Sequence, residues 1–103
     1  MTNWKRHELR TARALGGQRA GATGKGGEDV TGVKWLTIEC KERQSLPAWL
    51  TGAMAQAVGY ATQKPSDTLP IVVLHEKAKR SDNDLVVMRR QDFVAWHGVI
   101  ENE

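Results

Sequence analysis

Cysteine is almost absent from this sequence of 103 residues, which contains Cys40 and no other. One cysteine excludes an internal disulfide and a zinc site built from several cysteines. Long apolar runs are missing too, since the longest, Leu69–Leu74, has the length of a buried strand and is far too short to cross a bilayer. The first residues, Met1–Glu8, contain no apolar stretch of the signal-peptide type. We therefore expect a cytoplasmic protein.

Positive charge is only slightly in excess, since the net charge is +3. This balance permits a nucleic-acid partner without requiring one. A chain of this length can bury a single modest core and leaves little room for a second. We expect one domain over residues 1–103.

Side-chain periodicity and turn residues predict a mixed α/β fold in the order helix, strand, strand, helix, strand, strand, helix. The apolar run at Leu69–Glu76 is typical of a central strand that is covered on both faces. We expect it to pair antiparallel with Leu85–Met88, and we expect a loop at Gln18–Gly27. The helices are predicted at Asn3–Leu15, Ser45–Thr62 and Asp92–His97.

Residues alternate in character from Trp35 to Lys41, which is typical of a strand with one face on the core. Glu39 and Lys41 then project from the same face. Asp29 can reach them if the chain folds back at Thr31–Lys34. Two carboxylates and a lysine that converge on one face are costly to bury and usually bind a metal or move protons. The side chains expected on the opposite face are Leu36, Ile38 and Cys40.

Glu8 lies within the apolar stripe that Trp4, Ala12 and Leu15 form on the first predicted helix. One interpretation makes it a carboxylate at the edge of the core that is tied to a neighbouring arginine. The other makes it a third acid that faces Asp29 and Glu39. The sequence leaves both open.

Basic side chains occur in several predicted loops and could hold the phosphates of a nucleic acid. Taken singly, each is more often a solvated surface charge. The candidates are Arg19, Lys25, Arg43, Lys77, Lys79 and Arg80.

Asp29, followed by Glu39-Cys40-Lys41, in this order of helices and strands, resembles the PD-(D/E)XK nuclease superfamily. Within it, the segments Arg13–Gly17 and Trp35–Arg43 are similar to small Holliday-junction-resolvase-like nucleases of phages and prophages. Gln56 and Tyr60 fit the Q-x-x-x-Y signature of the RecB-type lineage. Glu28 stands where the superfamily motif has proline. The resemblance extends from Trp4 to Trp96 and implies a restriction-endonuclease-like core, with a mixed central sheet flanked by helices.

The resemblance also implies roles for individual residues. Asp29, Glu39 and the carbonyl of Cys40 would bind Mg²⁺ or Mn²⁺, and Glu8 would be an outer or second-metal ligand. Lys41 would orient or help to deprotonate the attacking water. On the second helix, Gln56 would orient the lysine or a phosphate, and Tyr60 would pack beneath the substrate or contact it.

The function implied is a metal-dependent endodeoxyribonuclease, a phosphodiester hydrolase that acts on branched DNA such as Holliday junctions. It would work in a bacterial or phage-infected cell, as a homodimer whose symmetry suits a four-way junction. Alternatives are an exonuclease or nickase of the same superfamily and a non-catalytic DNA-binding or assembly subunit with the same fold. A purely structural alternative makes Glu39 and Lys41 a surface ion pair.

Overall fold

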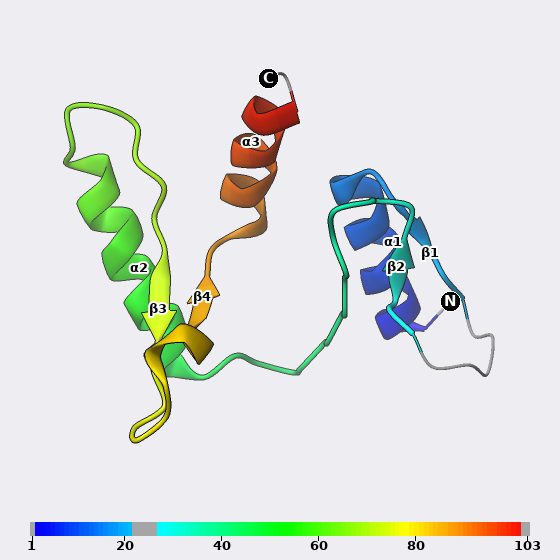
Figure 1. Ribbon diagram of the computed structural model, residues 1–103, viewed down its shortest axis with the longest axis horizontal. Coiled ribbons are helices and arrows are strands. Elements are labelled where there is room, and N and C mark those ends of the chain that lie inside the picture. Colours follow the sequence, from blue (N-terminus) through cyan, green and yellow to red (C-terminus); the bar gives the residue numbers. More distant parts are fainter. Residues whose placement is uncertain (1, 22–26, 102–103) are drawn as a thin grey trace. The chain divides into compact units, whose positions relative to one another are not determined.

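The computed structural model describes residues 2–21 and 27–101. The chain divides into two compact units, the N-terminal unit Met1–Gln44 and the C-terminal unit Ser45–Glu103 (Figure 1). Within the described residues the fold is mixed α/β, with three α-helices and two antiparallel sheets of two strands each. The elements are α1 Asn3–Leu15, β1 Gln18–Arg19, β2 Val30–Thr31, α2 Ala48–Thr62, β3 Val72–Leu74, the 3₁₀ helix Ser81–Asn83, β4 Leu85–Val87 and α3 Arg90–Glu101.

Helix α1 begins and ends where the sequence predicts. Thr2 precedes it in extended conformation, and Gly16 ends it in the left-handed region at a φ of 80°, which glycine adopts without a steric penalty. Its buried residues are Glu8, Thr11 and Ala12, so the stripe predicted to face inward does so at its centre. Trp4, at the end of that stripe, is half exposed.

Three short segments of the N-terminal unit lie side by side and pack against α1 (Figure 1). Strand β1 pairs antiparallel with β2, with Arg19 opposite Val30. On the other side of β2, Val30 forms an isolated antiparallel bridge with Ile38. The position between two neighbours explains why the Val30 side chain is completely buried. The expected loop at Gln18–Gly27 therefore contains a strand in its first two residues, and residues 22–26 of it lie outside the described residues.

The predicted hairpin around Thr31–Lys34 forms, but its second arm is not a regular strand. The backbone N–H of Leu36 donates to the carbonyl of Val33 across the turn. From Trp35 to Lys41 the side chains alternate between exposed and half-buried, as the sequence predicts. Only Ile38 in this arm forms a β-bridge. The two-residue period therefore predicts correctly which side chains of this arm are exposed, although the arm lacks the full ladder of backbone hydrogen bonds of a regular strand.

Helix α2 begins at Ala48, three residues after the expected start at Ser45, and ends at Thr62 as predicted. Proline disfavours helical conformation in the residue before it, so Pro47 sets the start of the helix. The residues of α2 that are half-buried are Leu50, Ala53, Met54, Ala57, Val58 and Ala61.

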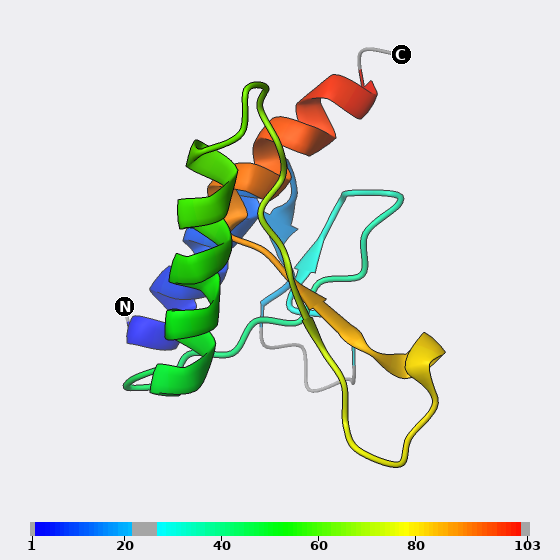
Figure 2. The ribbon, with the colours of Figure 1, turned by 90° about the vertical axis from the view of Figure 1, so that its left-hand side faces the viewer.

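Strands β3 and β4 pair antiparallel, as expected, with Val73 opposite Val86. Figure 2 shows α2 running alongside β3, and the two elements are in contact. The prediction of a strand over Leu69–Glu76 that is covered on both faces is wrong. Strand β3 spans only Val72–Leu74. Val73 on β3 and Val86 opposite it on β4 remain 55% and 56% exposed, so one face of the strand pair is open.

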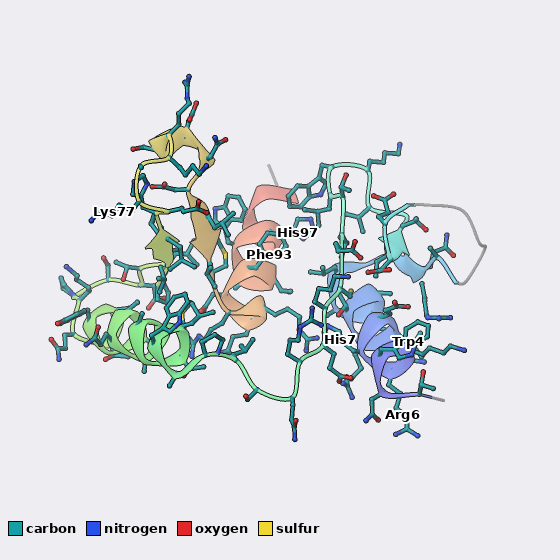
Figure 3. The ribbon with its side chains drawn as sticks, turned by 90° about the horizontal axis from the view of Figure 1, so that it is seen from below. Trp4, Arg6, His7, Lys77, Phe93 and His97 are labelled. Atoms are coloured by element: carbon teal, nitrogen blue, oxygen red, sulfur yellow. The ribbon has the colours of Figure 1, made fainter. Side chains whose placement is uncertain are left out.

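Helix α3 is longer than the expected Asp92–His97, since it spans Arg90–Glu101. The Arg89 guanidinium donates two hydrogen bonds to the Asp92 carboxylate, at 2.8 and 3.3 Å, which favours a helix start at this point. Phe93 is half-buried and lies one turn from His97, with the two rings stacked (Figure 3). Trp96, on the same helix, is exposed.

The expected mixed central sheet is not confirmed, because both strand pairs in the described residues are antiparallel and lie in separate two-stranded sheets. Across residues 2–21 and 27–101, no helix combines the length and the apolar character needed to span a membrane.

Candidate functional site

An open pocket of about 400 Å³ lies on the N-terminal unit. It brings together side chains from the start of α1, from the residue before β2 and from the chain after Ile38. Acidic and basic groups alternate around it. Its lining residues are Trp4, His7, Glu8, Asp29, Glu39, Cys40, Lys41, Glu42 and Arg43.

Asp29 is fixed at the pocket by its own backbone and by its side chain. Its N–H donates to the carbonyl of Ile38 at 2.9 Å, and its carbonyl accepts from the N–H of Ala20 at 3.0 Å. Its carboxylate Oδ2 accepts the backbone N–H of Cys40 at 2.7 Å. Asp29 therefore joins all three segments of the unit, and its carboxylate has little freedom to move.

The carboxyls of Asp29 and Glu39 are hydrogen-bonded to each other, and this contact moves their pKa values apart. The hydrogen bond from Glu39, followed by that from the Cys40 N–H, lowers the pKa of Asp29. The same contact and the negative charge of Asp29 raise the pKa of Glu39. Two carboxyls in contact disfavour each other's ionisation, so the pKa of one falls and that of the other rises.

Two carboxyls in contact are close enough to share a cation. Mg²⁺ prefers hard oxygen ligands and keeps several waters, so two carboxylates suffice to hold it. No group of three or more His, Cys, Asp or Glu side chains within the described part of the chain is arranged to hold a metal. Asp29 and Glu39 are the two carboxylates of the pocket that could hold a largely hydrated Mg²⁺ or Mn²⁺.

Lys41 and Cys40 follow Glu39 and point in different directions. Lys41 is exposed, lines the pocket, and its positive charge acts on the carboxyls of both Asp29 and Glu39. The Cys40 thiol contacts the Thr11 hydroxyl on α1, and burial raises the pKa of the thiol. A thiol with a raised pKa is a poor nucleophile, so the backbone of Cys40 matters here more than its sulfur.

Glu8 lines the same pocket but is tied to an arginine. The Nε of Arg19, on β1, donates to the Glu8 carboxylate at 2.8 Å. The Arg19 guanidinium also lies 5.5 Å from the centre of the Trp4 ring. Of the two interpretations of Glu8, the structure displays the ion pair with a neighbouring arginine.

The other predicted site residues lie elsewhere. Gln56 and Tyr60 are exposed on α2, in the C-terminal unit. Lys77, Lys79 and Arg80 belong to the loop between β3 and β4, from which Lys77 projects (Figure 3). Arg80 there is paired with the neighbouring Asp82. Lys25 lies outside the described residues.

Sequence reasoning missed three residues of the pocket, namely Trp4, His7 and Glu42. Trp4 and His7 project from the first turns of α1 (Figure 3). Trp4 lies at i, i+3 to His7 and at i, i+4 to Glu8, so it neighbours both on the helix surface, and this spacing is the signal in the sequence that could have identified it. Glu42 continues the exposed segment that carries Glu39 and Lys41.

Comparison with family models, with curated proteins and with solved structures finds no match to this chain. The assignment of a function therefore depends on the chemistry of the pocket.

Proposed function

We propose that this protein is a divalent-metal-dependent endodeoxyribonuclease that hydrolyses phosphodiester bonds in branched or structured DNA. The observation that carries the proposal is the contact between the Asp29 and Glu39 carboxyls, in one open pocket with Lys41. The proposal also draws on the resemblance of the D…E-x-K pattern to the PD-(D/E)XK nucleases.

Phosphodiester hydrolysis needs an attacking water, a counter-charge for the phosphate and a means to stabilise the leaving oxygen. Bound Mg²⁺ supplies Lewis acidity and an activated water. Asp29, with its lowered pKa, supplies a permanently ionised ligand at neutral pH. Glu39 supplies the second carboxylate. The Lys41 ammonium orients the water and offsets negative charge on the phosphate.

DNA would approach the pocket along its rim, where Arg43 lies beside Lys41. Contacts to phosphates supply most sequence-independent affinity, so we expect recognition of DNA shape more than of base sequence. Lys77 and Lys79 are further candidates, in the C-terminal unit. Within the proposal, the fold is a reduced restriction-endonuclease-like core, and a homodimer would match the two-fold symmetry of a four-way junction.

The test is a cleavage assay on labelled four-way junction, flap, single-stranded and linear duplex DNA. Each substrate is incubated with Mg²⁺, with Mn²⁺ or with EDTA. Metal-dependent cutting of the junction within the strand is the expected result. An Asp29→Ala variant should lose it.

Two other outcomes would reassign the protein. Cutting only from DNA ends would indicate an exonuclease, for which Gln56 and Tyr60 fit the RecB-type signature. Binding of the junction without cutting, unchanged in Asp29→Ala, would indicate a non-catalytic DNA-binding subunit and would contradict the proposal.

A further inference from the structure

Arg19 and Glu8 form an ion pair in which each side chain is engaged by the other. Its charge alone would make Glu8 a candidate metal ligand, and Arg19 a candidate contact to a DNA phosphate. The side chains of Arg19 and Glu8 are only 22% and 11% exposed, and the 2.8 Å contact is a charge-assisted hydrogen bond. The guanidinium of Arg19 also lies near the Trp4 ring, in cation–π geometry. Arg19 is thus held by two neighbours, one charged and one aromatic.

Withdrawal of Glu8 from Arg19 would leave a mostly buried cation without its counter-charge. An unpaired buried charge is costly, so a cation in the pocket must compete against the intact ion pair for the Glu8 carboxylate. Asp29 and Glu39 line the same pocket in contact with each other, and no ion pair of the kind that holds Glu8 engages either of them among the described residues. Glu8 is therefore less available to a cation than Asp29 and Glu39 are.

We propose that Arg19 is a positioning residue that withholds Glu8 from the metal site, so that the pocket takes one divalent cation per chain on Asp29 and Glu39. This inference rests on the proposed metal-dependent function. It assigns Glu8 to the structure of the pocket wall, and it assigns Arg19 to Glu8 instead of to a DNA phosphate. A second cation would need further anionic ligands, and the ion pair with Arg19 withholds Glu8 from that role.

The experiment counts bound Mn²⁺ directly, by calorimetry and by the electron paramagnetic resonance signal of the free ion, without DNA and without turnover. The wild-type chain is expected to bind one Mn²⁺. Glu8→Gln keeps the size of the side chain and an acceptor for Arg19, and it should leave the stoichiometry unchanged and the affinity within about twofold. Glu39→Gln should weaken binding at least about tenfold, because it removes a ligand.

Substitution of Arg19 tests the positioning role itself. In Arg19→Gln the Glu8 carboxylate is released into the pocket, so Mn²⁺ affinity should rise about threefold or more, or a second ion should bind. Arg19→Lys keeps a positive charge beside Glu8, so its Mn²⁺ affinity should lie closer to that of the wild type than that of Arg19→Gln does, with one ion bound. The double variant Arg19→Gln/Glu8→Gln should return to one ion, which separates the release of a ligand from loss of structure. Circular dichroism establishes that each variant is folded.

Two results would overturn the inference alone: two Mn²⁺ bound to the wild type, or a loss of at least about tenfold in affinity in Glu8→Gln. An Mn²⁺ isotherm that is the same in Arg19→Gln as in the wild type would also contradict it. No Mn²⁺ binding by the wild type would overturn the inference together with the metal-dependent function. One bound ion with no DNA cleavage would overturn the nuclease proposal and leave the role of Arg19 standing.

Discussion

The two units of the chain differ in what they bury and in what they expose. In the N-terminal unit, Val30 and Ala12 are buried beside the polar residues Glu8 and Thr11. In the C-terminal unit, large apolar side chains are exposed on α2 and on both strands, Trp49 at 64% and Leu85 at 64% among them. Among the ion pairs, Arg19–Glu8 is mostly buried, whereas in the C-terminal unit Arg80–Asp82 is exposed and Arg89–Asp92 is partly buried.

This difference indicates where chemistry can take place. The contact between the Asp29 and Glu39 carboxyls shifts the pKa values of both acids in opposite directions, and clustered groups with shifted pKa values are typical of functional sites. The C-terminal unit offers an apolar surface, and extended surfaces of this kind usually mark contact with another surface. We therefore expect substitutions in the N-terminal unit to affect catalysis and internal stability more strongly than matched substitutions in the C-terminal unit.

The largest difference should appear between two Asp→Asn substitutions. Asp29→Asn keeps the acceptor for the Cys40 N–H but removes the ionised ligand, so junction cleavage should fall at least about 100-fold. Asp67→Asn alters an exposed carboxylate in the C-terminal unit and should change the rate less than about twofold. The initial rate of Mg²⁺-dependent cleavage measures both. Equal losses in the two variants would remove the distinction between the units.

Two Gly→Ala substitutions should change stability in opposite directions. A Cβ at Gly17 would clash with the backbone carbonyl oxygen of Thr31 and press on Val30, so Gly17→Ala should destabilise by about 2–3 kcal/mol. A Cβ at Gly52, within α2, meets nothing within 4 Å, so Gly52→Ala should stabilise by about 0.5–1 kcal/mol. Urea unfolding followed by circular dichroism gives both values. A stable Gly17→Ala protein would contradict the close packing of β1 on β2.

A smaller difference is expected between the two ion pairs. Arg19→Gln leaves the mostly buried Glu8 without its charged partner and should lower the free energy of unfolding by about 1–2 kcal/mol. Arg80→Gln breaks an exposed pair, whose side chains are 82% and 64% accessible, and should have no measurable effect. Thermal denaturation at low and at high salt compares them. A salt-sensitive loss in Arg80→Gln that exceeds the loss in Arg19→Gln would be inconsistent with the structure.

The smallest expected effect is a dependence of metal affinity on pH. The pKa of Glu39 lies above its ordinary value of 4.5, so a proton competes with the cation over a range that begins above that pH. Mn²⁺ affinity should therefore rise severalfold between about pH 5 and about pH 7. The same raised pKa means that the contribution of Glu39 to stability is present at acid pH and is lost as the pH rises through the pKa. Calorimetry at several pH values detects the first effect, and an affinity independent of pH would argue against the Asp29–Glu39 contact.

Local patterns in the sequence identify much of the fold. The cap and the glycine of α1 give its bounds, and the alternation from Trp35 to Lys41 gives the exposed face. The pairing of β3 with β4 also follows from local signals. The two-residue strand β1 could not be predicted, because so short a segment has no measurable period. The apolar run at Leu69–Glu76 gives too long a strand, because apolar character does not reveal that one face stays open.

The candidate site is predictable only in part, for a related reason. The period of a strand places Glu39 and Lys41 together, and the turn at Thr31–Lys34 brings Asp29 back to them. The partner of Glu8 cannot be read in this way, because Arg19 lies eleven residues further along the chain, and the pairing depends on how β1 packs on α1. Sequence patterns therefore find acids and bases on one element and miss the ion pairs between elements.

The most direct test of the central claim is the rate at which Lys41→Ala cuts a four-way junction in Mg²⁺, compared with the matched variant Lys34→Ala. Lys34 is an exposed lysine in the same unit that does not line the pocket. We predict cleavage by the wild type and by Lys34→Ala that EDTA abolishes, and a loss of at least about 100-fold in Lys41→Ala. Cleavage that Lys41→Ala leaves unchanged, or no metal-dependent cleavage by the wild type, would contradict the account.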